Sequence, residues 1–238
     1  MASIVDNRGY SQGFALSQAL TIRTRRRVQA MLDEMDVSSP RTILELGCGT
    51  GEASYLLSTL TTADVIGVDL CESFIQSARE NYDRPNLKFI AMDLLLEDVA
   101  DRFTGKIDYI VGNGILHHLR ADLPQALLRL NQLLSHGGRF IFWEPNLANP
   151  YLFFIFRFEK LRRLARLEPN EMAFYCRELV RVFESIGLTQ IHASCRDFLL
   201  PNTPGMLIKP AIWLGAVMER IPCMSSLAQS IFIVGTKQ

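Results

Sequence analysis

Two adjacent histidines, His117 and His118, are the side chains best suited to acid–base chemistry in this sequence. They follow an apolar stretch that ends in Asn113 and Gly114. Histidine titrates near neutral pH, so such a pair can accept a proton from a hydroxyl group or a protonated amine. The alternative is structural, with one histidine capping a turn and the other packing against a sheet. Glu144, which ends another apolar run before a proline, is a second polar group expected at the rim of the ligand cleft, near the histidines.

A glycine-rich turn gives the strongest signal for ligand binding. Apolar or β-branched residues at 42–46 surround Glu45, and glycines follow at Gly47, Gly49 and Gly51. The apolar run predicts a buried strand of a parallel sheet, and the glycines allow a sharp turn and a close approach of the backbone to a ligand. The next residues predict a helix, whose N-terminus favours negative or polar ligand groups.

A carboxylate at the end of the next strand completes the pattern. The segment 64–69 reads D-V-I-G-V-D and ends in Asp69. The glycine spacing G-x-G-x-G differs from the dinucleotide fingerprint G-x-G-x-x-G, which argues against an oxidoreductase. The combination E-x-G-x-G-x-G followed by V-D closely resembles the first two motifs of the class I S-adenosylmethionine-dependent methyltransferases. A purely structural glycine turn is the simpler alternative.

The resemblance implies S-adenosylmethionine as the cofactor. The glycine loop should lie along its methionine and ribose portions, and Asp69 should accept hydrogen bonds from both ribose hydroxyls. Asp93, after the third expected strand, corresponds to the residue that accepts the adenine amine, although it could instead cap a turn. The complete set of expected cofactor contacts is Glu45, Gly47, Cys48, Gly49, Gly51, Asp69, Leu70, Asp93, Leu94, Asn113 and Gly114.

The methyl acceptor is expected to be a small apolar, aromatic or lipid-like molecule. In such a transfer the protein mainly aligns the nucleophile, and His117 and His118 are the expected catalytic residues. The sequence Asn113-Gly114-Ile115 lacks the aromatic residue that stacks on a nucleic-acid base in related amino-methyltransferases. A protein or RNA methyltransferase and a non-catalytic cofactor-binding regulator are the alternatives. Weaker substrate contacts are expected from Tyr10, Glu144 and Phe154, and no residue spacing signals a metal site.

The elements that must position these residues follow an alternating order. Strands alternate with helices between residues 41 and 144, which predicts a parallel sheet covered by helices on both faces. Ligands of such sheets bind at the carboxyl ends of the strands. The resemblance implies an α/β, Rossmann-like, mostly parallel sheet of seven strands, with the last strand antiparallel and inserted before the sixth. Strands are expected at 42–46, 64–68, 87–92, 107–111, 139–143, 189–194 and 230–235. Helices are expected at 14–35, 51–60, 72–82, 95–102, 123–134, 176–185 and 208–219.

The chain is expected to form one domain over residues 1–238, with a helical cap at 1–40 and a cofactor-binding core at 41–144. Two excursions, 145–172 and 196–228, are expected to form the acceptor pocket or a lid, because long ordered excursions in compact domains are usually functional. The aromatic and basic segment 151–167 fits a lid, a peripheral membrane contact or a homodimer interface. Tyr10 and Arg23 are candidate contacts of the cap, although Arg23 also fits a solvated basic helix face.

The composition indicates which partners and which cellular location to expect. The chain has 238 residues, 48% of them hydrophobic, and a formal net charge of zero, which gives no reason to expect a nucleic-acid partner. Its five cysteines are scattered and form no C-x-x-C pair, so a reducing cytoplasm is the expected location. The first residues lack the apolar core of a signal peptide, and no apolar run reaches the roughly 20 residues that span a bilayer.

Overall fold

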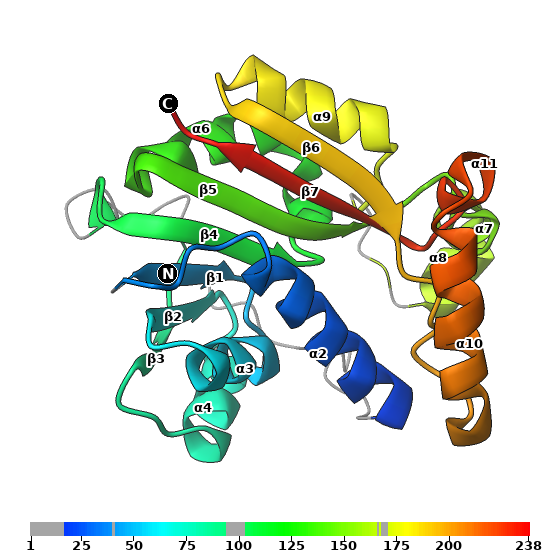
Figure 1. Ribbon diagram of the computed structural model, residues 1–238, viewed down its shortest axis with the longest axis horizontal. Coiled ribbons are helices and arrows are strands. Elements are labelled where there is room, and N and C mark those ends of the chain that lie inside the picture. The colour runs from blue at the N-terminus through cyan, green and yellow to red at the C-terminus, as the bar shows by residue number, and fades with distance from the viewer. Residues whose placement is uncertain (1–16, 40, 94–102, 166, 168–170) are drawn as a thin grey trace.

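A seven-stranded sheet forms the centre of the protein (Figure 1). The computed structural model describes residues 17–39, 41–93, 103–165, 167 and 171–238. The strand order is β3-β2-β1-β4-β5-β7-β6, and β7 runs antiparallel to both of its neighbours while the other strands are parallel. The expected mixed sheet with an inserted last strand is therefore confirmed. The strands are β1 Thr42–Leu46, β2 Asp64–Asp69, β3 Leu87–Ala91, β4 Ile107–Asn113, β5 Leu134–Pro145, β6 Thr189–Arg196 and β7 Ser230–Thr236.

Helices cover both faces of this sheet, as Figure 1 shows. One face is covered by α2 (Gln18–Leu32), α3 (Glu52–Leu60) and α4 (Glu72–Asn81), and the other by α6 (Leu123–Leu133) and α9 (Cys176–Ser185). The expected helix at 95–102 lies outside the described residues. Because β1 to β5 are parallel, their carboxyl ends lie at one edge of the sheet, where the glycine loop and the histidine pair also lie.

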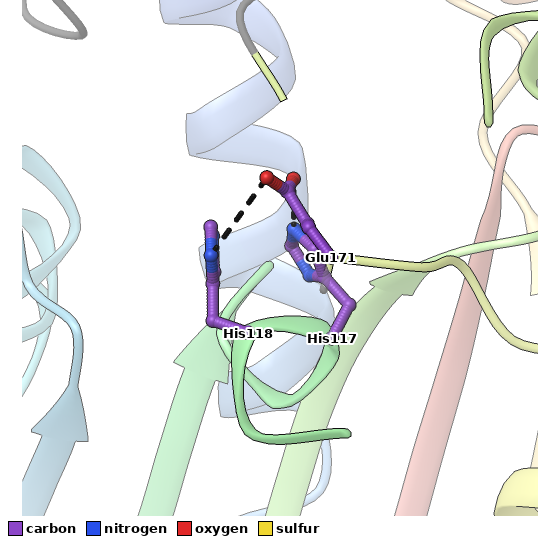
Figure 2. A group of neighbouring side chains, drawn as sticks. All are labelled: His117, His118 and Glu171. Atoms are coloured by element: carbon purple, nitrogen blue, oxygen red, sulfur yellow. Dashed lines mark hydrogen bonds and ion pairs between the residues drawn. The ribbon is translucent and has the colours of Figure 1, made fainter. Parts of the chain in front are cut away.

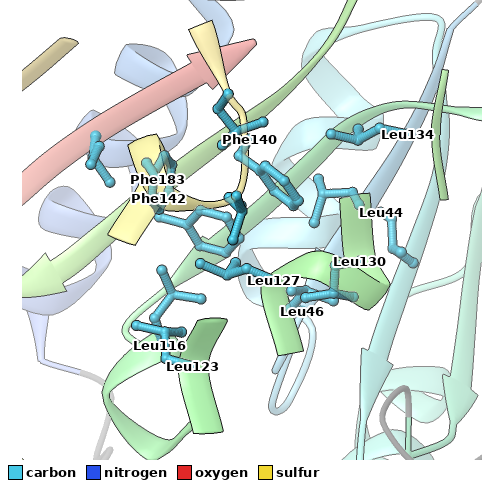
Figure 3. Close-up of a cluster of buried hydrophobic side chains, with 14 of the residues drawn as sticks. Leu44, Leu46, Leu116, Leu123, Leu127, Leu130, Leu134, Phe140, Phe142 and Phe183 are labelled. Carbon is cyan, nitrogen blue, oxygen red and sulfur yellow. The ribbon is translucent and has the colours of Figure 1, made fainter. Parts of the chain in front are cut away.

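Alternation along β5 supplies the two cores that lie on opposite faces of the sheet. Phe140 and Phe142 point into a cluster that Leu127 of α6 and Phe183 of α9 complete (Figure 3). Ile141, the residue between the two phenylalanines, belongs to the cluster on the other face. Side chains of a strand alternate between faces, so an uninterrupted apolar run is the pattern expected for a strand buried on both sides. This packing on both faces fixes the position of β5, and with it that of Glu144 near the carboxyl end of the strand.

The boundary between α6 and β5 differs from the expectation. The helix was expected at 123–134 and ends at Leu133, close to the expectation, but the strand, expected to begin at Arg139, begins at Leu134. Leu134 is fully buried and pairs with Ile107 of β4, so sheet pairing outweighs continuation of the helix. Asp122 occupies the N-cap position of this helix, but its side chain makes no capping hydrogen bond.

Four further helices lie at the carboxyl edge of the sheet. The segment after β5 forms α7 (Pro150–Arg157) and α8 (Glu159–Leu164), and the segment after β6 forms α10 (Gly205–Met218) and α11 (Pro222–Ser225). All four lie beyond the carboxyl ends of β4 and β5 in Figure 1. None of the helices in the described part of the chain is long and apolar enough to cross a membrane.

The N-terminal helix α2 is held against this edge by a buried carboxylate. Asp197, which follows β6, accepts hydrogen bonds from Arg23 Nε at 2.6 Å and from Arg27 Nη2 at 2.9 Å. Arg27 also donates to Asn113 Oδ1 at 2.7 Å, which ties the helix to the end of β4. Burial lowers the pKa of Arg27 to about 10, against the opposing effect of Asp197, and the guanidinium stays charged at neutral pH. Arg23 thus lies in an ion pair rather than on the solvated face considered from the sequence.

Candidate functional site

The glycine loop between β1 and α3 combines tight packing with one open side. Gly47, Gly49 and Gly51 all have positive φ values, of 62°, 52° and 87°. A Cβ atom at Gly47 would lie 2.5 Å from Ile115 Cδ1, and one at Gly51 would lie 2.6 Å from Phe89 Cζ. A Cβ atom at Gly49 would meet no atom within 4 Å. The first and third glycines therefore allow close packing of the loop, and the middle one exposes bare backbone to open space.

Asp69 is positioned beside that open backbone. Its Oδ2 atom accepts a hydrogen bond from Gly49 N at 2.9 Å, and its Oδ1 atom accepts one from Cys71 N at 2.9 Å. A carboxylate oxygen has more than one lone pair, so both oxygens keep the capacity to accept a hydroxyl donor. The loop and Asp69 therefore fit the ribose and methionine portions of S-adenosylmethionine. Leu70, the next residue, is exposed at the same edge and offers an apolar surface.

Two of the expected contacts lie beneath the loop rather than at its surface. Glu45 is buried and accepts a hydrogen bond from Ser54 Oγ, which ties β1 to α3. Burial raises the pKa of Glu45 to about 7, although the Ser54 hydrogen bond opposes this effect. Burial also raises the pKa of the Cys48 thiol. Any contact of Cys48 with the cofactor is therefore expected from its backbone, and direct contact by Glu45 stays a prediction that its burial disfavours.

The remaining expected contacts are spread around the same edge. Asp93 follows β3 and is partly buried, whereas Leu94 and Tyr10 lie outside the described residues. Gly114 has a φ of 80°, and its N–H donates to Trp143 O at 2.7 Å. Phe154 of α7 is 53% exposed and stacks on Phe158, so its role as a substrate contact stays a prediction.

Glu144 holds the turn that carries the histidines. Its Oε1 atom accepts hydrogen bonds from the backbone N–H groups of Ile115 at 2.9 Å and Leu116 at 2.7 Å. Its Oε2 atom accepts one from His117 N at 3.2 Å. The glutamate is only 1% exposed, and this burial disfavours the direct substrate contact predicted for it. Its position at the end of β5 instead fixes the short helix η1 (Leu116–Asp122).

His117 lies between two buried carboxylates. Its Nδ1 atom is 2.8 Å from Glu144 Oε2, and its Nε2 atom is 3.1 Å from Glu171 Oε1. Burial alone would lower the pKa of His117, but the hydrogen bonds and charges of Glu144 and Glu171 together raise it to about 9. An imidazolium donates from both ring nitrogens, so the protonated form satisfies both carboxylates at neutral pH.

His118 is the more accessible member of the pair. Figure 2 shows its ring beside that of His117, with Glu171 over both. The two ring centroids are 4.2 Å apart, and His118 Nδ1 lies 3.9 Å from Glu171 Oε2. The His118 side chain is 26% exposed. Ligand-type atoms of these three residues lie within 4.8 Å of one another, which is also a spacing that a metal ion could bridge. The absence of a metal, expected from the sequence, stays a prediction.

Ile115 connects the cofactor loop to the histidine turn. Its side chain fills the space that a Cβ atom at Gly47 would need, and its N–H donates to Glu144. A Cβ atom at Gly114 would lie 3.5 Å from His117 Cε1. Ile115 therefore lies between the glycine loop and the acid–base cluster, which consists of His117, His118, Glu144 and Glu171. A reaction between a bound cofactor and a second molecule requires such an arrangement.

A family model described as a methyltransferase domain matches residues 38–184. The chain belongs to this methyltransferase family. The match covers the loop, the histidine turn, Glu144 and Glu171, and it ends within α9. The predicted class I S-adenosylmethionine-dependent methyltransferase, with that cofactor, is thereby confirmed at the level of the family.

Similar proteins differ in what their names say they methylate. The chain is 26% identical over 170 residues to the ubiquinone biosynthesis O-methyltransferase of Bordetella avium, covering 64% of this chain and 69% of the relative. It is 30% identical over 106 residues to the ribosomal protein L11 methyltransferase of Thermoanaerobacter pseudethanolicus, covering 43% of this chain and 34% of the relative. The chain spans about a third of the length of several curated relatives that it matches.

A solved structure of similar length supports the fold. The crystal structure of a SAM-dependent methyltransferase from Archaeoglobus fulgidus matches with a TM-score of 0.66 and 15% identity, covering 96% of this chain and 98% of that one. At this identity the likeness shows the Rossmann-like fold alone.

The contacts of two carboxylates at this edge were not predicted from the sequence. Glu171 meets His117 across 54 residues, and Asp197 meets Arg27 across 170 residues. No local spacing connects either pair. The only signals available were a lone acidic residue in an irregular segment and a carboxylate just after a strand.

Proposed function

We propose that this protein transfers the methyl group of S-adenosylmethionine to a hydroxyl or amine of a small apolar or lipid-like acceptor. The observation that carries the proposal is the chain of contacts Glu144–His117–Glu171–His118 beside the open side of the glycine loop. It provides an accessible imidazole, that of His118, next to the buried carboxylate of Glu171, which is itself in contact with His117. Such an arrangement suits removal of a proton from an acceptor.

The cofactor is proposed to lie along the loop at Gly49, with Asp69 holding the ribose. The open space at Gly49 and the fixed oxygens of Asp69 support this placement. S-adenosylmethionine supplies an activated methyl group together with its leaving group. The tasks left to the chain are to align the acceptor and to exclude water.

His118 is the residue that we propose takes the proton. His117 is already protonated at neutral pH and has both ring nitrogens occupied, so it serves as a positioning residue. Its positive charge holds Glu171 in place, and Glu171 in turn orients the His118 ring. The pair expected from the sequence to act as catalytic bases is thereby divided into a positioning residue and a base.

The apolar or lipid-like character of the acceptor is supported by the helices at this edge. Phe153 and Phe154 of α7 are exposed, and Phe158 stacks on Phe154 between α7 and α8. The relative from Bordetella avium is named as an O-methyltransferase of ubiquinone biosynthesis, whereas the L11 relative is named for a protein. The formal net charge of zero gives no support for an RNA acceptor.

The experiment that tests the proposal is a screen of acceptors with isotopically labelled S-adenosylmethionine, read by mass spectrometry. We expect label transfer to phenolic, quinol or lipid acceptors in the wild-type protein. His118→Ala should reduce turnover by about 100-fold or more, in keeping with a general base. His136→Ala, which changes an exposed histidine far from the cluster, is the matched control and should retain turnover.

Binding of S-adenosylhomocysteine, measured by calorimetry, separates the parts of the proposal. His118→Ala should bind it as the wild type does, because the proposed cofactor contacts are the glycine loop and Asp69. Full turnover in His118→Ala would exclude the base. Absence of S-adenosylhomocysteine binding in the wild-type protein would contradict the proposed cofactor site itself.

A further inference from the structure

Two helical excursions carry most of the exposed hydrophobic side chains of the described chain. Thirteen of the eighteen large hydrophobic side chains that are exposed lie in residues 150–164 and 205–227. Single exposed apolar residues are normal, but a concentration of them marks an interaction site. We call this set the apolar face. Its members are Tyr151, Phe153, Phe154, Phe158, Leu161, Leu164, Met206, Leu207, Trp213, Leu214, Val217, Ile221 and Leu227.

Helix α10 is apolar on both of its sides. Ile208 on its inner side is buried in a cluster with Ala19 of α2. On its outer side Met206 is 85% exposed and Trp213 is 70% exposed. A surface helix ordinarily presents polar side chains to solvent. The outer side of α10 therefore has the composition of a buried surface.

The two excursions lie at one corner of the molecule. Asn146 Nδ2, just before α7, donates to the carbonyl oxygens of Ser226 and Ala228, each at 2.8 Å. Asn149, the cap of α7, donates to the carbonyl of Leu227 at 2.6 Å. The loop after α11 is thus bonded to the start of α7, and Figure 1 shows α7, α8, α10 and α11 at the same edge. The apolar face is shared by both excursions.

Basic side chains accompany the apolar face. Glu159 is offset by its ion pair with Arg163, and Glu219 accepts a hydrogen bond from the backbone N–H of Asp197. No other acidic residue lies within residues 150–164 or 205–227. The excess of positive charge is complementary to an anionic surface. The exposed basic residues are Arg157, Lys160, Arg163, Lys209 and Arg220.

We propose that the apolar face docks on the surface of an anionic lipid bilayer. Its aromatic and aliphatic side chains would enter the headgroup region, and its basic side chains would contact lipid phosphates. A second copy of this chain is a less suitable partner, because a symmetric contact would bring the same basic residues together. The inference rests on the proposed function in one respect, since it gives the acceptor a route from the bilayer to the site.

The experiment is flotation with vesicles of phosphatidylcholine, with and without phosphatidylglycerol. We expect the protein to float with the mixed vesicles, to bind pure phosphatidylcholine more weakly, and to lose affinity as salt is raised. Trp143 is buried, so a blue shift of tryptophan emission on binding reports Trp213. Trp213→Phe should abolish most of this optical signal while retaining flotation.

Variants distinguish the apolar face from the rest of the surface. Trp213→Gln combined with Leu214→Gln, and separately Lys209→Glu, should weaken vesicle binding by at least about tenfold. Leu128→Gln changes a 41% exposed leucine on α6, and Arg181→Glu changes an exposed arginine on α9. These matched controls should bind vesicles as the wild type does.

Three outcomes would overturn the docking proposal. They are absence of vesicle binding, equal loss of binding in the control variants, and a stable dimer by sedimentation velocity that Trp213→Gln dissociates. S-adenosylhomocysteine affinity, and turnover of a water-soluble acceptor without lipid, are measured on the same variants. If these two activities persist while vesicle binding is absent, the docking proposal fails and the proposed methyl transfer stands.

Discussion

The protonation of His117 gives a prediction that can be developed quantitatively. Glu144 and Glu171, both buried, contact its two ring nitrogens and raise its pKa to about 9. In the unfolded chain the pKa of histidine is about 6.5. The folded protein therefore binds this proton more tightly than the unfolded chain does.

The sign and size of the effect on stability follow from that difference. The stabilisation is fully present below pH 6.5 and is lost as pH rises to about 9, because there the unfolded chain releases the proton first. A difference of roughly 2.5 pH units corresponds to about 3 kcal/mol of unfolding free energy. Two further charged or titratable groups act on the cluster: His118, whose Nδ1 atom lies 3.9 Å from Glu171 Oε2, and Arg27, which interacts electrostatically with Glu144.

Two measurements test this prediction. The first is NMR titration of the imidazole nitrogens, which is practical because the sequence contains only four histidines. The second is urea unfolding from pH 6 to pH 9 for the wild type and for Glu171→Gln. The variant retains a hydrogen-bond acceptor but removes one negative charge. Its His117 pKa should fall, and its loss of stability over this pH range should be smaller than that of the wild type.

A midpoint for His117 at or below pH 6.5 would refute the reasoning. It would mean that burial outweighs the two carboxylates and that His117 is neutral at physiological pH. His117 would then again be a candidate for the base. Identical pH dependence of stability in the wild type and Glu171→Gln would refute it independently of the NMR assignment.

Three further predictions concern the loop and its supports. Asp69→Asn should weaken S-adenosylhomocysteine binding by about tenfold or more in calorimetry, because charged acceptors make the stronger hydrogen bonds, whereas Asp64→Asn at the exposed start of β2 should not. Gly51→Ala should lower the unfolding free energy by roughly 2–4 kcal/mol, because Gly51 has a φ of 87° and a Cβ atom there would clash with the buried ring of Phe89. The control Gly137→Ala should lower it by only about 1–2 kcal/mol, because Gly137 has a φ of 76° but open space around it. Asp197→Asn should cost about 3 kcal/mol in urea unfolding, because it leaves two partly buried arginines without a counter-charge.

Each of these predictions has an outcome that contradicts it. Unchanged S-adenosylhomocysteine affinity in Asp69→Asn would remove the ribose assignment. Equal unfolding free energies for Gly51→Ala and Gly137→Ala would show that packing at the loop is not tight. A wild-type stability for Asp197→Asn would show that the attachment of α2 to the sheet does not depend on its arginine pairs.

The elements that the sequence predicted best are those with a strong local pattern. The strand at 42–46 and the helix at 176–185 have the expected bounds, because an apolar run in the first and a helical periodicity in the second are each followed by a glycine. The start of β5 was wrong by several residues. Leu134 has an apolar side chain that fits either a helix end or a strand, and only its pairing with Ile107 decides between them.

The candidate site was predictable only where chemistry and spacing are local. The glycine loop and Asp69 are close in sequence to the turns that they form, and the hydrogen bond between Gly49 and Asp69 follows directly from two adjacent parallel strands. The environment of the histidines could not be derived in this way. Glu171 reaches His117 from an irregular segment, and its presence changes the expected role of that histidine from base to positioning residue.

The two asparagines before α7 have a consequence for protein engineering. Their side chains bond three consecutive carbonyl groups of residues 226–228, and so couple two stretches of chain that are far apart in sequence. A chimera that imports one excursion from another methyltransferase would break this coupling and leave buried amides without acceptors. Both excursions must be exchanged together, with their asparagines, if acceptor choice is to be transplanted onto this scaffold.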